Sequence, residues 1–176
     1  MQPETIDKLP GDYLAGFVEG EGCFALKYRL DRKIRNGKTR EYFYWNAEFA
    51  IVLRSDDANL LHKIRDTLGC GSVTFVNGGK LARYSVQNPK LLREIFIPLF
   101  NKHPLRGKKA SDFKLWSRGV ELISGARLKN INVKKGVRGF ISNHLEPDIE
   151  KELHKIRNQM LEYKSSRPNP FKFNSI

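Results

Sequence analysis

Several classes of protein are excluded by what the sequence has little of. Only two of its 176 residues are cysteines, too few for a disulfide framework or a four-cysteine zinc site and typical of a reducing compartment. No apolar run approaches the roughly 20 residues of a membrane-spanning helix, so we expect a soluble globular protein without a membrane partner. The four histidines show no close metal-ligand spacing, which argues against an HNH-type nuclease.

Acidic residues are also scarce. The 19 Asp and Glu residues are outnumbered by 32 Lys and Arg, which gives a formal net charge of +13. Such an excess favours a polyanionic partner, above all a nucleic acid. Charge alone does not distinguish DNA from RNA, and a ribosomal protein or a membrane-surface protein stays open as an alternative at this point.

The beginning of the chain, MQPETIDKLPGDY, has neither the apolar core of a signal peptide nor the Arg-rich composition of a transit peptide. We therefore expect an intracellular protein that acts where it is made: the bacterial cytoplasm or, if it is organelle-encoded, the chloroplast stroma or mitochondrial matrix. The length favours one domain over residues 1–164, with a core at 11–122, a helical extension at 123–164 and a flexible tail at 165–176.

Hydrophobic periodicity predicts an α+β fold with the element order αββαββα and further C-terminal helices. Helices are expected at residues 13–19, 58–68, 89–100, 108–122 and 147–163. Strands are expected at residues 23–30, 40–54, 71–76 and 80–87. Asn36-Gly37 is a strong hairpin signal, and Asp12 is the expected N-cap of the first helix. One four-stranded antiparallel sheet with helices on one face is the economical packing.

The stretch LAGFVEGEGC, residues 14–23, carries the most chemical information. Gly16 and Gly20 lie on one face of a helix and permit close approach of a second backbone, at a cost of about 1 kcal/mol each relative to alanine. Glu19 and Glu21 flank Gly20 where this helix should end. Carboxylates at the negative pole of a helix need a compensating cation, and a divalent metal bound by carboxylate and backbone carbonyl oxygens would supply it.

This stretch resembles the LAGLIDADG motif of homing endonucleases. The resemblance extends to the order of the elements and to residues 104–113, PLRGKKASDF, which are similar to the family segment that bears an active-site lysine. It implies a saddle-shaped sheet over the DNA major groove. It also implies a site-specific, Mg2+-dependent endonuclease, with Mn2+ or Ca2+ able to substitute in binding, that cleaves both strands of a long, roughly palindromic target as a homodimer and promotes intron mobility.

The resemblance also implies roles for residues of the motif. Glu21 is the predicted catalytic metal ligand, assisted by the Gly20 carbonyl, whereas Glu19 is predicted to be structural. The predicted dimer interface consists of Leu14, Gly16, Phe17 and Gly20. Candidates for ordering solvent and stabilising charge are Arg54, Arg106 and Lys108, with Lys109 ranked behind them.

The polar faces of the strands are predicted to read DNA. The predicted readers are Lys27, Arg29, Tyr44, Asn46, Glu48, Ser72, Thr74, Arg83 and Ser85, with donors for guanine and acceptors for cytosine among them. Four residues around the hairpin tip are expected to contact phosphates or outer bases: Lys33, Arg35, Lys38 and Arg40. Two departures from the family pattern are that both motif acids are Glu where Asp is usual, and that Leu53 stands where some members carry a polar residue.

Two other functions share features with this sequence. Pro147-Asp148 followed by Glu162-Tyr163-Lys164 imitates a PD…ExK nuclease signature, but both halves fall on a predicted helix rather than on strands. The main alternative is an intron-RNA maturase or a non-cleaving DNA-binding protein on the same scaffold. Retention of both acids favours cleavage, because a pure binding protein gains nothing from anionic groups held near phosphates.

Overall fold

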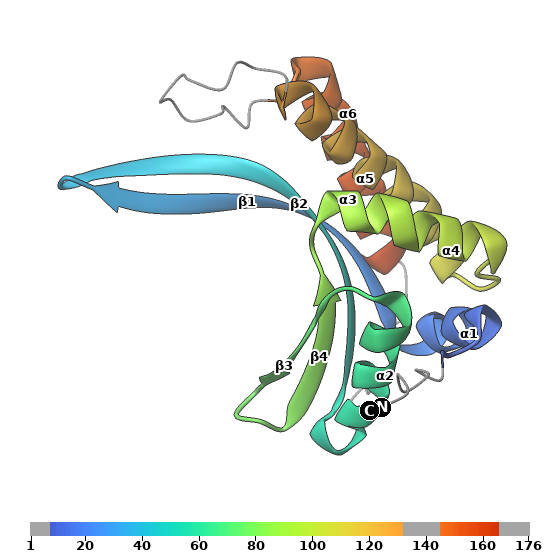
Figure 1. The fold of residues 1–176 in the computed structure, drawn as a ribbon. Coiled ribbons are helices and arrows are strands. Elements are labelled where there is room, and N and C mark those ends of the chain that lie inside the picture. The colour runs from blue at the N-terminus through green and yellow to red at the C-terminus, as the bar shows by residue number, and fades with distance from the viewer. Residues whose placement is uncertain (1–7, 132–144, 166–176) are drawn as a thin grey trace, which may run out of the picture.

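The computed structural model describes residues 8–131 and 145–165, and it confirms the predicted α+β architecture. Four strands form one antiparallel sheet in the order β1-β2-β4-β3, with the helices on one face and the other face open (Figure 1). The strands are β1 Gly22–Arg35, β2 Lys38–Arg54, β3 Ser72–Val76 and β4 Leu81–Val86. The helical elements are α1 Gly11–Glu21, η1 Ser55–Asp57, α2 Ala58–Leu68, α3 Pro89–Leu91, η2 Leu92–Phe96, α4 Ile97–Lys102, α5 Lys109–Ile131 and α6 Pro147–Ser165.

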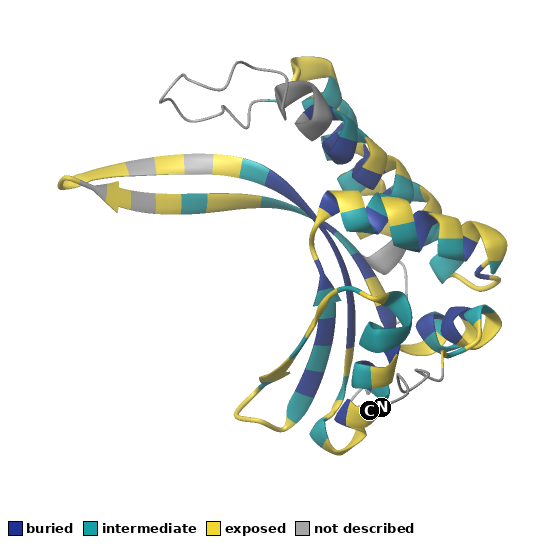
Figure 2. Cartoon of the chain, viewed as in Figure 1, coloured by how far each residue is buried: buried dark blue, intermediate teal, exposed yellow. Residues whose placement is uncertain are grey.

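The β1–β2 hairpin is the longest element of the sheet. Its turn lies at Asn36 and Gly37, which both have positive φ, 51° and 70°, as a two-residue hairpin turn requires. The outer half projects beyond the helices as an arm (Figure 1), and its exposed residues contrast with the buried inner half (Figure 2). The Asn-Gly prediction is confirmed, and the arm places basic register positions far from the core.

The core lies between the helices and the covered face of the sheet, and it is dominated by aromatic rings. Phe24 of β1 has its ring centroid 5.0 Å from that of Trp116 in α5, and Phe49 of β2 lies 4.7 Å from Phe96. Offset and edge contacts of this kind add to the stabilisation from apolar burial. Because Trp116 is fully buried, the start of α5 is held at a fixed position relative to β1.

Three local features differ from the sequence predictions. Asp12 makes no capping hydrogen bond to α1, whose N-cap residue is Pro10; instead its Oδ1 lies 2.7 Å from His103 Nδ1. The predicted helix from residue 89 is continuous in direction but contains the π-helical segment η2. Helix α5 extends nine residues past the predicted end at 122, to Ile131. Local sequence did not reveal these features because each depends on tertiary packing.

The C-terminal helix α6 packs onto the body through apolar residues. Leu153, Ile156 and Met160 are all buried, and the His154 ring lies 4.8 Å from the Trp45 ring. Most of the predicted tail lies outside the described residues. Among residues 8–131 and 145–165, no helix combines the length and apolar character that crossing a membrane requires.

Candidate nucleic-acid interface and active site

The C-terminal end of α1 is fixed by the loop that precedes α5. The Glu19 side chain turns back toward this loop, and its Oε1 accepts hydrogen bonds from the backbone N–H groups of Arg106 and Gly107, the latter at 2.8 Å. A Cβ at Gly107 would lie 2.7 Å from Glu19 Oε2, so a larger residue there would shift the end of the Glu19 side chain. The contacts agree with a structural role for Glu19.

Glu21, the last residue of α1, is exposed and directly precedes Gly22, the first residue of β1. The next residue, Gly22, donates its N–H to the Val18 carbonyl, which closes the final turn. Gly22 pairs with Ile51 of β2, so the motif ends near the C-terminal part of that strand. In the described part of the chain, no three or more His, Cys, Asp or Glu side chains gather as a metal site.

The lysine at the motif is Lys109. Its Nζ lies 2.9 Å from both the Glu19 and the Gly20 carbonyl oxygens, so an ammonium group sits on the negative pole of α1. The sequence prediction placed Arg106 and Lys108 ahead of it, yet both of these side chains are exposed, and Arg106 contacts the motif through its backbone N–H. Helix α5 begins at Lys109, so this lysine contacts the carbonyls at the end of α1, whereas the catalytic roles of the three cations stay predictions.

Arg54, the remaining catalytic candidate, ends β2. Its guanidinium donates to both carboxylate oxygens of Asp56, with Nη2 2.8 Å from Oδ2. The two side chains are 79% and 63% exposed, and a pair this accessible contributes little to stability. Arg54 is therefore available at the surface, three residues beyond the strand position paired with Gly22.

One face of α1, called the flat face below, carries two stacked aromatic rings and two exposed glycines. Tyr13 and Phe17 stack with their ring planes 8° apart, and Gly16 and Gly20 are exposed beside them. A Cβ added at either glycine would meet no described atom within 4 Å. The spacing of positions 13, 16, 17 and 20 puts them on one helical face, which a second helix could approach closely.

Two neighbouring residues of α1, Tyr13 and Leu14, differ in exposure. Leu14 is only 3% exposed and belongs to the core of its own subunit, so it does not present a side chain to a partner. Tyr13, by contrast, is 44% exposed, although it was not among the predicted interface residues. The signal was available, because Tyr13 lies three residues before Gly16 and seven before Gly20 on the same side of the helix.

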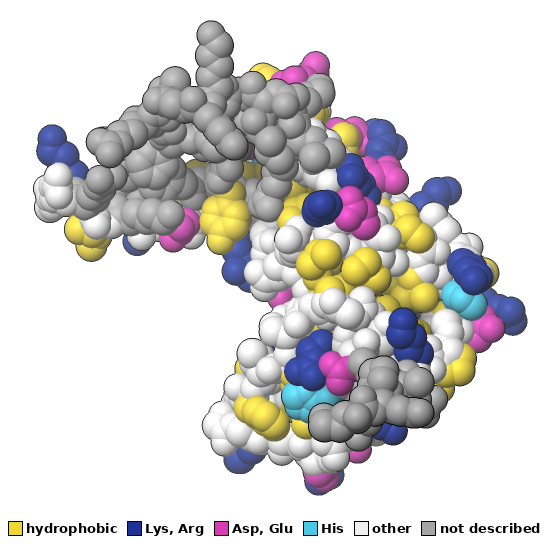
Figure 3. Space-filling model, in the orientation of Figure 1, with side chains coloured by type: hydrophobic (Ala, Val, Ile, Leu, Met, Phe, Trp, Pro, Cys, Tyr) yellow, Lys and Arg dark blue, Asp and Glu magenta, His cyan; other side chains and the backbone are white. Residues whose placement is uncertain are grey.

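Strand register places the predicted DNA readers together on the open face. Lys27 pairs with Asn46 and Arg29 with Tyr44 across β1 and β2, while Thr74 pairs with Arg83 and Ser72 with Ser85 across β3 and β4. Paired residues in an antiparallel ladder point to the same face. The space-filling view shows the hollow of this face between the arm and the β3–β4 hairpin (Figure 3).

The arm continues the same alternation. Lys33 pairs with Arg40, and Arg35 with Lys38, so the four predicted tip residues form two cross-strand pairs. Lys38 is exposed. The side chains of the other three lie outside the part of the structure that is described. That this region contacts phosphates or outer bases of a nucleic acid stays a prediction.

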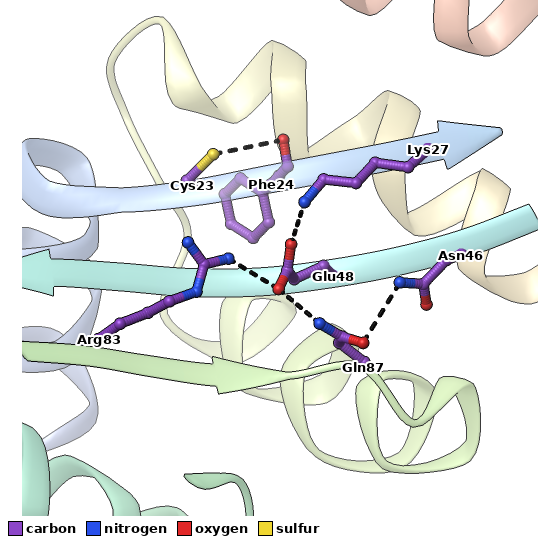
Figure 4. A network of polar contacts seen from close by, with 7 residues as sticks. All are labelled: Cys23, Phe24, Lys27, Asn46, Glu48, Arg83 and Gln87. Carbon is purple, nitrogen blue, oxygen red and sulfur yellow. Dashed lines mark hydrogen bonds and ion pairs between the residues drawn. The ribbon is translucent and has the colours of Figure 1, made fainter. Parts of the chain in front are cut away.

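Glu48 lies at the centre of a polar network on the open face (Figure 4). It is 2% exposed and accepts hydrogen bonds from Lys27 Nζ, from Arg83 Nη2 at 2.7 Å and from Gln87 Nε2 at 2.8 Å. Gln87 in turn accepts from Asn46 Nδ2 at 3.4 Å. That Glu48 reads a base stays a prediction, and the structure shows a buried carboxylate whose two oxygens already accept three hydrogen bonds within the protein.

Burial of Glu48 by itself raises the pKa of its carboxyl, but the hydrogen bonds from Lys27, Arg83 and Gln87 outweigh burial and lower the pKa to about 2. The folded protein therefore binds a proton here less readily than the unfolded chain, whose carboxyl has a pKa near 4.5. A lowered folded-state pKa stabilises the fold above the unfolded pKa, and this stabilisation is lost as the pH falls toward 2.

Glu48→Gln should consequently lower the free energy of unfolding by on the order of 3 kcal/mol at neutral pH. The difference from wild type should shrink between pH 4.5 and 2, the unfolded and folded pKa values, as urea unfolding at a series of pH values would measure. Glu41→Gln is the matched control, because Glu41 forms an exposed pair with Arg32 and should change stability by less than about 1 kcal/mol. A Glu48→Gln deficit that is independent of pH would contradict the assignment.

Known proteins share both the sequence pattern and the fold. The family model for LAGLIDADG endonuclease matches residues 14–120. The "Probable intron-encoded endonuclease Cox1-I1b" of Schizosaccharomyces pombe is 28% identical over 118 residues, which are 67% of this chain and 29% of the relative. The "Uncharacterized 50.9 kDa protein in ND4 intron 1" of Podospora anserina is 33% identical over 63% of this chain and 24% of its own length.

Solved structures agree. The LAGLIDADG homing endonuclease I-GzeII in complex with its DNA target is 26% identical, with a TM-score of 0.67 over 92% of this chain and 47% of that one. I-SmaMI bound to cleaved DNA, at 23% identity, has the same fold with a TM-score of 0.68, over 88% of this chain and 45% of that one. The chain thus spans about a quarter of the curated relatives and about half of the solved structures. With a model match that covers more than half of its residues, the chain belongs to the LAGLIDADG endonuclease family.

Proposed function

We propose that this protein is a site-specific homing endonuclease that hydrolyses both strands of a long DNA target as a homodimer and thereby promotes the mobility of its intron. The observation that carries the proposal is the end of α1, where the exposed Glu21 carboxylate follows the Gly20 carbonyl and Lys109 lies on that same carbonyl. An acid, a backbone carbonyl oxygen that accepts from Lys109, and the ammonium group of that lysine thus lie at one helix end beside a basic, open sheet.

The oxygen donors at this position fit a divalent metal. The Glu21 carboxylate and the Gly20 carbonyl would hold Mg2+, a hard cation that prefers oxygen ligands and retains several waters. Mn2+ or Ca2+ would substitute in binding. When bound, the metal would supply an activated water and a counter-charge for the leaving oxygen. The longer Glu side chain reaches further from the helix end than the Asp that is usual in the family.

The surrounding cations have separate roles in the proposal. Lys109 is fixed by two carbonyls and would balance the charge of Glu21 and of an approaching phosphate. Arg106 and Lys108 are exposed and would contact the phosphate backbone beside the site. Arg54 would exchange its surface pair with Asp56 for phosphate, since an exposed ion pair is easily broken.

A second copy of the chain would complete the site. The sequence contains one motif, so one copy contributes one Glu21. The flat face of α1, formed by Tyr13, Gly16, Phe17 and Gly20, would pack against its symmetry mate and bring two motif ends together. A two-fold axis through this contact requires a roughly palindromic target, with half-sites about one helical turn apart.

The open face would lie in the major groove of each half-site. Arg29, Tyr44, Ser72, Thr74 and Ser85 lie on this face and would contact the DNA directly, as would Lys27 and Arg83. Their donors match the acceptors of guanine and the mixed edge of adenine. The arm, with positions Lys33, Arg35, Lys38 and Arg40, would extend the contact toward the outer base pairs.

Exchange of the divalent cation tests this function. In Mg2+ the protein is expected to linearise a plasmid that carries its target, and EDTA should abolish cleavage. Ca2+ should support binding of the duplex without cleavage, because binding needs only the charge of the cation whereas hydrolysis needs an activated water. A mobility shift assay measures binding and a gel-based cleavage assay measures hydrolysis, both on the same duplex. Binding of intron RNA with no DNA cleavage in any cation would instead favour a maturase.

A further inference from the structure

We propose that Glu48 is a positioning residue for sequence recognition: it holds the end groups of Lys27 and Arg83 in place for contacts with base edges without touching the DNA itself. This inference rests on the proposed function, since it assumes that the open face lies in the major groove. In this role Glu48 does not read a base. It contributes to the choice of DNA sequence from a buried position in the middle of the sheet (Figure 4).

The network buries the Glu48 carboxylate and leaves the two cations that it binds, Lys27 and Arg83, partly exposed. Glu48 Oε2 accepts from Lys27 and Oε1 accepts from Arg83 and Gln87, so both oxygens are occupied. The Glu48 side chain is 3% exposed, whereas those of Lys27 and Arg83 are 36% and 31% exposed. The acid is thus covered by its partners, and the partners face the open side.

Each held cation keeps donors for a ligand. An ammonium has three N–H groups and a guanidinium has five, and a single nitrogen of each is hydrogen-bonded to Glu48. Guanine presents two acceptors, O6 and N7, on its major-groove edge. A cation whose end group is already ordered loses less rotamer freedom when it contacts such an edge, so the network favours a defined contact over a mobile one.

The charge of Glu48 also disfavours the competing contact. Unrestrained Lys and Arg side chains bind phosphates, which carry no sequence information. Glu48 offsets one of the two positive charges and repels phosphate oxygens from this part of the sheet. Its low pKa keeps it ionised at every pH at which the protein would act. Without Glu48, both cations would be free to follow the backbone.

The test is a binding selection from a randomised duplex library in Ca2+, carried out with wild type, Glu48→Gln and Glu41→Gln. Glu41→Gln removes the same charge from the same strand, but Glu41 pairs with Arg32 on the opposite face of the hairpin. Single variants Lys27→Gln and Arg83→Gln identify the base pairs that these two residues face. Glu48→Gln should lose about tenfold or more of the discrimination at those base pairs, while Glu41→Gln keeps it.

Binding to a random duplex supplies a second readout. Glu48→Gln should bind the random duplex more tightly than wild type. Its affinity should also fall more steeply with salt concentration, by the amount that about one to two additional phosphate contacts produce. A purely structural role would weaken binding at all positions and would not steepen this slope. Unchanged base preferences in a folded Glu48→Gln variant, or an equal loss at every position, would overturn the inference.

A double variant guards against loss of the fold. Glu48→Gln/Arg83→Gln removes one charge of each sign and leaves Lys27 intact. If the network positions Lys27, the double variant loses the preference at the base pair that Lys27 faces, whereas Arg83→Gln alone keeps it. Retention of that preference in the double variant would contradict the inference. A wild-type protein that enriches no duplex would overturn the proposed function and this inference together.

Discussion

Glu21→Gln is expected to abolish DNA cleavage while DNA binding is kept or strengthened. The amide retains the size of the side chain but loses the negative charge that, in the proposed site, would hold a divalent cation beside the scissile phosphate. We expect a loss on the order of 1,000-fold in the cleavage rate at saturating protein. Because Glu21 is exposed, the substitution should leave the fold unchanged and should relieve repulsion from the DNA backbone. Single-turnover cleavage and a mobility shift on the same duplex measure the two effects.

Glu19→Gln is the matched control for this prediction. The two acids flank Gly20, but Glu19 accepts from the backbone N–H groups of Arg106 and Gly107. An amide oxygen can still accept from both, so Glu19→Gln should retain most of its cleavage activity and show a lower thermal stability. If Glu19→Gln is the inactive variant and Glu21→Gln the active one, the assignment of the two acids is reversed.

If the chain forms the proposed homodimer, Gly16→Leu should separate it and remove cleavage with it. A leucine on the flat face of α1 would hold the two motif helices apart, although within one subunit a Cβ at Gly16 meets no described atom within 4 Å. The substitution would enter the proposed two-fold interface twice, at a cost of about 1–3 kcal/mol on each side. We expect dimerisation to weaken on the order of 100-fold or more, as analytical ultracentrifugation would measure.

Gly125→Leu is the corresponding control. Gly125 lies in α5, away from the motif, and a Cβ there also meets no described atom within 4 Å. Gly125→Leu should remain dimeric and active. Gly125→Leu and Gly16→Leu should both unfold at temperatures close to that of wild type. A Gly16→Leu protein that stays dimeric and cleaves DNA would show that the α1 face is not the contact between subunits.

Much of the fold was predictable because local signals determine it. Asn36-Gly37 forms the predicted turn, and Gly69 ends α2 with φ at 67°, as the αL conformation of a helix C-cap requires. Alternation of side chains along each strand is likewise enough to identify the residues of the open face. These signals are short-range and carry their own geometry, so one sequence suffices to find them.

The details of the site were less predictable because they depend on contacts between distant segments. The choice of Lys109 over Lys108 follows from the residue at which α5 begins and from the bonds of Lys109 to carbonyls 90 and 89 residues away. No periodicity reveals that position. Leu14 and Tyr13 are adjacent and both largely apolar, so only the packing of α1 on the sheet shows which of them is exposed.

Glu48 illustrates the same limit on the sheet. Its sequence position correctly predicted a residue on the open face, but its role depends on which side chains lie across β1 and β4. Arg83 lies in β4 and Gln87 directly follows this strand, and α2 and β3 separate both residues from β2 in the sequence. The strand order β1-β2-β4-β3 nevertheless places them beside Glu48. A residue with the right chemistry for reading a base is therefore occupied by its neighbours.

The motif end is, in this proposal, a metal-dependent nuclease site that two copies of the chain form together. A cleavage selection on a randomised DNA library in Mg2+, with wild type beside Glu21→Gln, tests this most directly. Wild type should enrich one roughly palindromic site of about 20 base pairs, and Glu21→Gln should cut nothing. If neither protein cuts any sequence, or if both cut the same site equally, the roles of Glu21 and of the dimeric site are contradicted.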